Sequence, residues 1–497
     1  MTTDVIESVH VAEESEENMT DEEGCCISRK HLEFNCRSRN IQRRPNASDG
    51  MWLCVLLPLA LIINSWTYQK SSSLLYKVCG LISFGLFLQS LEILFKLSCR
   101  SVNVIANLAS KVVPGIATSL LIWFLLNIKL LFSFACGLPC CLIFNFIFLF
   151  LLRHLPRSFT LGEATIVAQG LVVFLFGASV KVFIAFDEPP EVKIEEMTAI
   201  LSVTLLGVFL LITITYGVSF CRRPAVFLIL LAAWVILTLL APITDPLPVE
   251  LVAEFIFLDT GRLSVLLIYA GVAGITGAFV AWKISKKSST SVSVRKIFHL
   301  VIVIVYLIGI IFQCTMLFLL SGLVLALFIV FEAVRLVAFP KIAPHLEAII
   351  AAFVDAKDAG LVAFTPIYLL AGCSLPLWFH PSPCDLTDST TFTLLPLIAG
   401  VLSVGIGDTM AGVVGSKFGR HRLVNSQKTV EGTVANIASQ LGMIFFLHFV
   451  GLLHLNIFTI IISFVGVIAN AIIEAKTDQV DNLFLPLVTF IIFSLRF

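Results

Sequence analysis

Long apolar runs separated by short polar loops dominate the chain. They lie near 51–66, 74–97, 104–126, 129–152, 163–186, 197–220, 224–243, 262–283, 297–313, 315–338, 359–379, 393–415, 433–453, 455–474 and 483–496. A helix needs about 20 apolar residues to cross a bilayer, and most of these runs approach that length. The pattern therefore predicts an all-α polytopic membrane protein with about 15 transmembrane helices.

Composition agrees with this class. Hydrophobic residues make up 58% of the 497 residues and charged residues 13%, whereas a soluble domain has about 25% charged residues. Lipid must therefore solvate most of the apolar surface. The net charge of +0 gives no general attraction to nucleic acid. The 13 cysteines form no CxxC pair, so we expect small buried hydrophobes rather than a zinc site.

Basic residues recur on one side of the expected helices. They precede the first run and follow the fourth, sixth, eighth and twelfth, whereas the opposite loops carry acids and prolines. Because cytosolic loops of membrane proteins are enriched in Lys and Arg, the N-terminus and the basic loops are expected in the cytosol. Residues 1–50 are polar and acidic, and we expect them to form a disordered cytosolic tail.

Polar chemistry is unevenly distributed along the chain. Residues 51–290 read as a scaffold of aliphatic helices, and an exception is Glu163, which we expect at a helix N-terminus. Residues 291–497 concentrate charges at the cytosolic ends of helices, and we expect this part to be the catalytic domain. Taken singly, most such charges are interfacial side chains or ion pairs. Candidates of this kind are Arg295, Lys296, His299, Glu332, Arg335, Asp355 and Asp358.

The densest motif surrounds Asp408. On a helix, this aspartate shares one face with Ala411, Gly412 and Gly415. A seam of small residues for helix packing explains the glycines, but it does not explain a carboxylate among them. A carboxylate at the cytosolic end of a close-packed helix is typical of a site for a metal ion that holds phosphates.

A basic loop follows this helix and runs to Thr433. Cations here suit a nucleoside triphosphate, and glycines allow backbone amides to approach its phosphates. The relevant residues are Lys417, Gly419, Arg420, Arg422, Lys428, Thr429, Glu431 and Gly432. The enrichment of cations in cytosolic loops explains the positive charges alone, without the Lys-Thr-x-Glu-Gly sequence. No Walker A motif and no protein-kinase loop is present in the sequence.

Three acids lie at the end of the fourteenth run and just after it. If the helix continues, Glu474, Asp478 and Asp481 line one face at i, i+4 and i+7. Like charges so close repel each other unless a cation neutralises them. A hard metal such as Mg²⁺ fits carboxylate ligands and shared phosphates.

Together these motifs resemble the dolichol kinases within the polyprenol kinase group. The resemblance rests on Asp408 with its glycines, on 428–433, on 295–299 and on the acidic ending, and more weakly on 156–164 and 355–370. It implies transfer of the γ-phosphoryl group of CTP to the terminal hydroxyl of dolichol at the cytosolic face of the endoplasmic reticulum. Dolichyl phosphate would then serve protein glycosylation.

On this reading the site residues divide by role. The base for the lipid hydroxyl is either Asp408 or His299, and Lys428 has a catalytic role. Thr429 and Glu431 bind the cytosine or ribose, or orient the lysine. The triphosphate is held by Lys417, Arg420, Arg422 and Lys428, beside Gly415, Gly419 and Gly432. Mg²⁺ is held by Asp408 with one or more of Glu474, Asp478 and Asp481.

Other functions remain open on the sequence. One is a cytidylyltransferase that makes a CDP-lipid, and another is a kinase for a different isoprenoid alcohol. A transporter is disfavoured because transporters typically show internal repeats and place polar groups near the bilayer midplane. In this chain the polar residues gather at one face of the membrane.

Overall fold

The computed structural model describes most of the chain. The ranges are 29–45, 47–70, 72–98, 104–188, 190, 193–285, 292–337, 345–347, 360–384, 394–423, 426 and 428–495. Within these ranges the secondary structure is helical, apart from an isolated antiparallel bridge between Arg422 and Thr429. The all-α prediction is confirmed.

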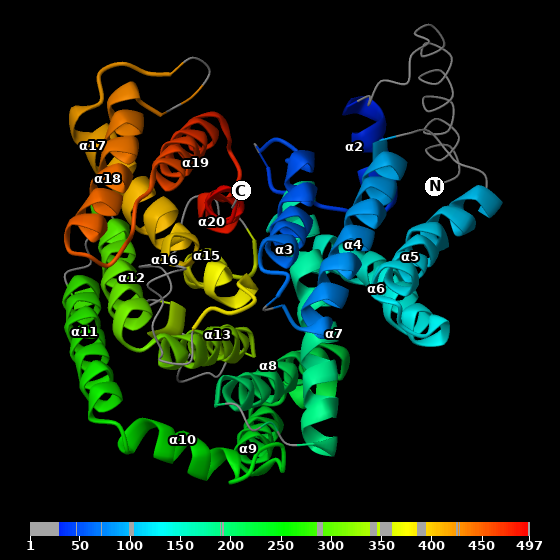
Figure 1. Cartoon of the computed structure of the whole chain (residues 1–497). Helices are drawn as coiled ribbons and strands as arrows, with labels where there is room; N and C mark the ends of the chain where they lie inside the picture. Colours follow the sequence, from blue (N-terminus) through cyan, green and yellow to red (C-terminus); the bar gives the residue numbers. More distant parts are fainter. Residues whose placement is uncertain are drawn as a thin grey trace, which may run out of the picture.

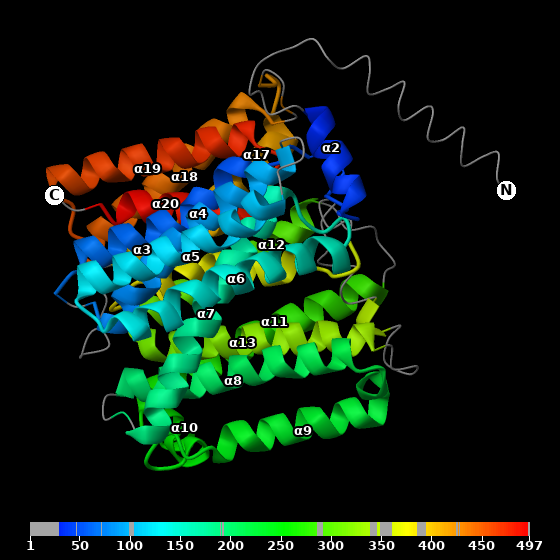
Figure 2. The ribbon, with the colours of Figure 1, turned by 90° about the vertical axis from the view of Figure 1, so that its right-hand side faces the viewer.

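The first part of the chain forms a bundle of helices (Figure 1). Its elements are α2 (Arg29–Ser38), η1 (Met51–Val55), α3 (Leu56–Thr67), α4 (Leu74–Ser98), α5 (Val104–Leu126), α6 (Leu130–His154) and α7 (Leu161–Asp187). The middle part contributes α8 (Lys193–Gly217), η2 (Ser219–Arg222), α9 (Pro224–Leu240), α10 (Pro248–Phe257) and α11 (Thr260–Ser285). Most of these helices run roughly parallel to one another, as expected for membrane-spanning elements (Figure 2).

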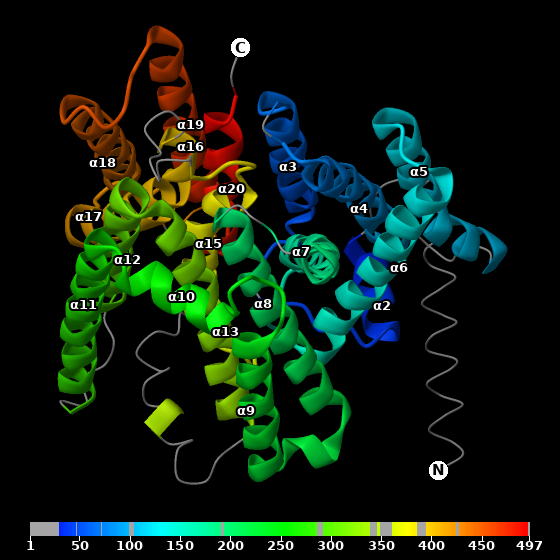
Figure 3. The same cartoon turned by 60° about the horizontal axis from the view of Figure 1, so that its bottom comes forward.

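The last part lies on the other side of the molecule from α4–α6 (Figures 1 and 3). Its elements are α12 (Val292–Phe312), α13 (Cys314–Leu336), α15 (Thr365–Phe379), α16 (Leu394–Leu397), η3 (Val401–Asp408), α17 (Thr409–Phe418), α18 (Val430–Phe449), α19 (Ile457–Lys476) and α20 (Asp481–Phe493). Helix α20 contacts α3, α15 and α19, and its Phe484 and Phe490 are fully buried. The C-terminal helix is therefore a central element that joins the two parts.

Each of the fifteen expected runs is occupied by helix in the described ranges. Eight described helices are long and apolar enough to span a membrane, and shorter apolar helices account for most of the other runs. Large apolar side chains such as Phe124, Phe146 and Phe183 are more than half exposed. Exposure on this scale fits contact with lipid tails, because a water-facing surface of this kind would aggregate.

Two helices differ from the sequence-based expectation. Helix α10 is a short extra element between α9 and α11. Helix α2 lies within residues expected to be disordered, where Leu32 and Cys36 are buried one helical turn apart and Asn35 donates to the Leu97 carbonyl at 3.0 Å. Two apolar residues at i and i+4 are enough to dock this short helix on α4, despite its polar composition. Residues 1–28 lie outside the described ranges.

The cysteines largely follow the expectation. Cys136, Cys140 and Cys141 are free and buried. Cys314 and Cys384, however, form a disulfide across 70 residues of sequence. Neither cysteine is part of a spacing motif, so only the fold reveals the pair.

Candidate active site

Asp408 lies where the type of helix changes within the expected twelfth span. This span consists of α16, the π-helical η3 and then α17, and Asp408 is the last residue of η3. π-Helical turns are rare and often occur at functional sites. A Cβ on the preceding Gly407 would lie 2.5 Å from Gln440 Nε2 and 2.8 Å from Asn436 Oδ1. A side chain at 407 would therefore displace the two amides of α18 that lie against η3.

The second turn of α12 faces Asp408. Lys296 Nζ lies 2.5 Å from Asp408 Oδ2, and His299 Nε2 lies 3.5 Å from the same oxygen. The three side chains are largely buried. A Cβ on Gly412 would lie 2.8 Å from Lys296 Cε, so this glycine leaves room for the lysine. The i, i+3 spacing of 296 and 299 brings both groups to one carboxylate. The side chain of Arg295 is outside the described ones.

Lys428 lies between two carboxylates of the C-terminal helices. Its Nζ is 3.0 Å from Glu474 Oε1 and 3.8 Å from Asp481 Oδ2. Burial alone would lower the pKa of Lys428, but the carboxylates of Asp481, Glu474 and Asp408 outweigh burial and raise that pKa above its ordinary value. The lysine is therefore a fixed cation that joins α19, α20 and the loop before α18. The charges of Asp408 and Glu474 also interact.

Two amides that the sequence analysis did not select support Glu474. Asn436 donates from Nδ2 to Glu474 Oε2, and Gln440 donates to Asn436 Oδ1. Both amides are fully buried, and Glu474 is 3% exposed. Buried polar groups need partners, and a chain of hydrogen bonds fixes the carboxylate's direction. The signal that could have found them is the i, i+4 pair of amides within the apolar run 433–453.

The Lys-Thr-x-Glu-Gly sequence builds the junction of α17 and α18. Thr429 caps α18 by accepting from Gly432 N at 3.2 Å. A Cβ on Gly432 would lie 2.9 Å from the Ala411 carbonyl and 3.3 Å from Gly415 Cα. A Cβ on Gly419 would lie 2.6 Å from Thr429 Cγ2. The glycines thus permit close contact between the two helices, and the threonine fixes where α18 begins.

The basic loop folds back on the start of α18. Glu431 Oε1 accepts from His421 Nδ1 at 2.7 Å and from the His421 backbone N at 3.2 Å. Val430 N donates to the His421 carbonyl at 2.9 Å, beside the bridge between Arg422 and Thr429. Lys417, Arg420 and Arg422 are exposed in or beside this loop. The loop therefore places exposed cations close in sequence to the fixed cation of Lys428.

Asp478 departs from the expected acidic face. Helix α19 ends at Lys476 and α20 begins at Asp481, so the three acids are not on one continuous helix. Asp478 accepts from Ser48 N at 2.7 Å and from Ser48 Oγ at 2.6 Å. Partial burial opposes ionisation, but these hydrogen bonds outweigh it and lower the Asp478 pKa. The condition of a continuous helix is therefore not met, and Asp478 contacts Ser48 on the N-terminal segment.

Glu163 anchors the loop that carries Asp478. It completes a capping box with Thr160 at the start of α7, as the sequence suggested for a carboxylate at a helix N-terminus. Its carboxylate also pairs with Arg44 Nη2 at 2.9 Å and accepts from Val480 N at 2.8 Å, in a fully buried position. The N-terminal segment, α7 and the 477–480 loop are thereby joined behind the start of α20.

Glu332 and Arg335 serve a different part of the chain. They form an ion pair at 2.6 Å, Glu332 accepts from Ala363 N at 2.9 Å, and Arg335 donates to the Leu361 carbonyl at 2.6 Å. These contacts hold the segment 361–363, which leads into α15, and they do not involve the Asp408 cluster. Asp355 and Asp358 lie outside the described residues.

No group of three or more His, Cys, Asp or Glu side chains in the described ranges is arranged to hold a metal ion by itself. Mg²⁺, however, is usually bound through one or two carboxylates together with substrate phosphates and water. Asp408 and Glu474 supply two such carboxylates, with Asp481 nearby on the other side of Lys428. The donor set fits a magnesium–nucleotide complex rather than a permanently bound ion.

Comparisons with known proteins identify the family of the chain. The family model for dolichol kinase matches residues 94–441. A dolichol kinase of Mus musculus is 32% identical over 361 residues, which cover 70% of this chain and 67% of the relative. The dolichol kinase EVAN of Arabidopsis thaliana is 33% identical over 245 residues, which cover 48% of this chain and 41% of the relative. No solved structure matches. This chain belongs to the dolichol kinase family.

Proposed function

We propose that this protein transfers the γ-phosphoryl group of CTP to the terminal hydroxyl of dolichol, and that the reaction takes place at the Asp408–Lys428 cluster. The observation that carries the proposal is the convergence of two lysines, three carboxylates and a histidine from five separate segments. Phosphoryl transfer requires positioning and neutralisation of charge more than covalent chemistry. A cluster of this composition meets both needs.

The triphosphate is proposed to lie over the start of α18. Lys428 precedes this start, and Thr429 caps it. The N-terminus of a helix favours anions because its backbone amides and dipole point toward them. Lys417, Arg420 and Arg422 are exposed beside it and free to close on phosphates. Gly415, Gly419 and Gly432 support this surface by keeping α17 and α18 in close contact.

Asp408 and Glu474 are proposed to hold Mg²⁺ with the phosphates of CTP. When bound there, the metal would neutralise negative charge on the transferred group. Lys296 and Lys428 already neutralise the two carboxylates. The same two ammonium groups would supply positive charge beside the phosphates of bound CTP. Asp481 would then remain as the carboxylate that positions Lys428.

The lipid hydroxyl is proposed to meet His299. On α12, Lys296, His299 and Val303 face inward, whereas Ile297, Leu300 and Ile304 are 38–54% exposed. The exposed stripe gives a hydrocarbon chain a path along the helix to its polar end. There, His299 accepts the hydroxyl proton while Asp408, 3.5 Å away, stabilises the imidazolium.

Membrane orientation is also proposed. The site lies at the ends of helices that carry the basic loops, which are expected in the cytosol. Cys314, which forms the disulfide with Cys384, is the first residue of α13. It follows the end of α12 that is opposite to Lys296. Disulfides persist in the lumen of the endoplasmic reticulum and are rare in the cytosol. Both features fit a multi-pass protein of this membrane with its site facing the cytosol.

Position-specific labelling of CTP tests the reaction. Membranes containing the protein are incubated with dolichol, Mg²⁺ and CTP labelled at either the γ- or the α-phosphate. A kinase moves only the γ-label into lipid. Transfer of the α-label would instead show a cytidylyltransferase, and transfer of neither label would contradict both activities.

A further inference from the structure

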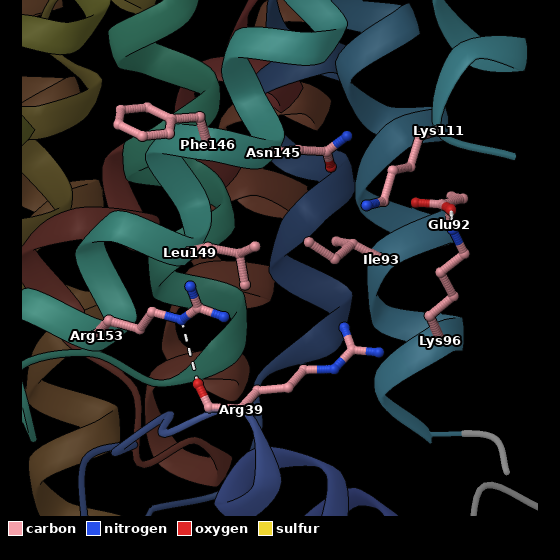
Figure 4. A pocket seen from close by; sticks show the side chains of 9 residues that line it. All are labelled: Arg39, Glu92, Ile93, Lys96, Lys111, Asn145, Phe146, Leu149 and Arg153. Carbon is pink, nitrogen blue, oxygen red and sulfur yellow. Dashed lines mark hydrogen bonds and ion pairs between the residues drawn. The ribbon is translucent and has the colours of Figure 1, made fainter. Parts of the chain in front are cut away.

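A cavity of about 310 Å³ lies far from the Asp408 cluster, between the N-terminal helices. Its walls come from α4, α5, α6 and the turn after α2 (Figure 4). None of its lining residues belongs to α12–α20. The volume is at the lower end of the range typical of ligand pockets, which suits a small head group rather than a nucleotide.

Positive charge dominates the lining. Arg39, Lys96, Lys111 and Arg153 line the cavity, against the single carboxylate of Glu92. Glu92 pairs with Lys96 on the same helix, so the other three cations exceed the local negative charge. The enrichment of cations in cytosolic loops accounts for basic residues at helix ends. It does not account for four of them, from four elements, around one cavity.

The orientation of these side chains favours an anion between them. Arg153 Nε donates to the Arg39 carbonyl at 3.2 Å, which ties α6 to the turn after α2. In Figure 4 the ends of Lys111 and Arg39 point toward the space beside Ile93. A phosphate there would meet cations from opposite walls, a geometry that gives strong charge-assisted hydrogen bonds.

A buried amide supplies a second observation. Asn145 lines the cavity, and its Nδ2 is buried without a hydrogen-bond acceptor among the described residues. Its Oδ1 already accepts from Gln89 Nε2 at 3.3 Å. A buried donor without an acceptor costs about 1–3 kcal/mol. Rotation of this amide toward an oxygen-rich ligand in the cavity would satisfy it.

The rest of the lining is apolar and continues to the lipid-facing surface. Ile93 and Leu149 line the cavity, together with Phe146, which is 70% exposed. Leu142 and Ile143, in the preceding turn of α6, are 43% and 45% exposed. A ligand here would therefore have a hydrocarbon chain beside its anionic group. Basic pockets between membrane helices on the cytosolic side commonly bind lipid head groups in this way.

We propose that this cavity binds the phosphate head group of a membrane lipid, with the hydrocarbon chain along Phe146 and α6. The site is separate from the transfer site, and its occupancy does not require the kinase reaction. Two kinds of lipid share the required chemistry, namely phosphatidate and a polyprenyl phosphate. They differ in their hydrocarbon chains and not in the phosphate monoester.

Lipid retention measures the binding directly. The full chain is purified into phosphatidylcholine nanodiscs containing a few per cent of dioleoyl phosphatidate or dolichyl phosphate, and bound lipid is counted by native mass spectrometry. We expect retention of one or both phosphate lipids over phosphatidylcholine. Retention of both indicates recognition of the head group alone, and retention of one shows that the hydrocarbon chain also contributes.

Variants locate the bound lipid. Each surface cation contributes about fivefold to binding of an anionic lipid, so K111A/R153A should weaken retention about 25-fold. R223A, which removes a cation just before α9 and outside the cavity, should leave retention unchanged. The conservative pair K111R/R153K should keep both folding and retention. The proposal is overturned if neither lipid is retained, if R223A weakens retention as much as the double variant, or if a correctly folded K111A/R153A retains lipid normally.

Discussion

The ammonium group of Lys428 lies 3.0 Å from the carboxylate of Glu474, although 46 residues separate them in sequence. Lys428 precedes α18, and Glu474 is in the last turn of α19. Asp481, 3.8 Å from the same ammonium, begins α20. One side chain therefore fixes the relative positions of three helix ends. It does so at the point where we place the phosphates of CTP.

Replacing Lys428 by Met should lower kcat/KM for CTP by about 10²–10³-fold, the usual effect of removing one preorganised electrostatic group. Steady-state kinetics with purified protein would check this. Lys476→Met, which removes an exposed cation two residues after Glu474, is the matched control. Equal losses in both variants would mean that Lys428 acts only through general surface charge.

The same contact predicts how the site responds to pH. The folded pKa of Lys428 is raised above that of an unfolded lysine, which is about 10.4. Its contribution to stability is therefore fully present below that value and is lost only as pH rises through the folded pKa. Between pH 7 and 9 Lys428 stays protonated, so its contribution to thermal stability should not change. The difference in melting temperature between wild type and Lys428→Met should therefore be constant over this range. A difference that vanished by pH 9 would contradict the ion pairs described for this lysine.

Gly432→Ala should separate α17 from α18. The added methyl group would meet backbone atoms of Ala411 and Gly415, and such overpacking costs about 1–3 kcal/mol. We expect a lower melting temperature and a loss of activity. Gly442→Ala in the same helix meets no atom within 4 Å, so it should be neutral or slightly stabilising. If the two variants behave alike, close contact of these helices is not needed.

Glu163→Gln tests the buried anchor of the 477–480 loop. It removes the charge that pairs with Arg44 while keeping the shape of the side chain. Breaking one partner of a buried ion pair costs about 3–5 kcal/mol, because the other charge stays buried and unpaired. Thermal unfolding should show this loss, and the double variant Arg44→Met with Glu163→Leu should recover part of it. A wild-type melting temperature in the single variant would show that the pair contributes no stability.

His299→Asn should lower kcat by about a hundredfold or more if His299 accepts the hydroxyl proton. KM for CTP should change little, because this residue does not contact the nucleotide in our account. The acidic limb of the pH–rate profile should also flatten, which a purely structural role would not cause. An unchanged profile with an altered KM would place His299 on the nucleotide instead.

The sequence predicted the helices well because membrane spans are read from composition over about 20 residues. It also selected Asp408, Lys428 and Glu474, since charges are costly near a bilayer and stand out, and the fold brings these three charges into one cluster. The differences between the sequence-based expectation and the structure have local causes. Asp478 was grouped with Glu474 because the i, i+4 spacing assumes a continuous helix, and α19 ends at Lys476.

Other parts of the site depend on long-range contacts that spacing does not encode. The partners of Glu163 are Arg44 and Val480, more than one hundred residues away on either side. Asn436 and Gln440 lie within an apolar run of the sequence, and only the fold shows that Asn436 donates to Glu474 and Gln440 to Asn436. Helix α2 was missed because two buried residues in a polar segment give little periodic signal.

The most direct test of the site compares two aspartates in one assay. Purified wild type, Asp408→Asn and Asp478→Asn are given γ-labelled CTP, Mg²⁺ and dolichol at equal protein concentration. Asp408 contacts Lys296 and His299, whereas Asp478 contacts Ser48. We predict that Asp408→Asn forms no labelled dolichyl phosphate while Asp478→Asn keeps most of the wild-type rate. Normal activity in a folded Asp408→Asn protein would contradict the proposed site.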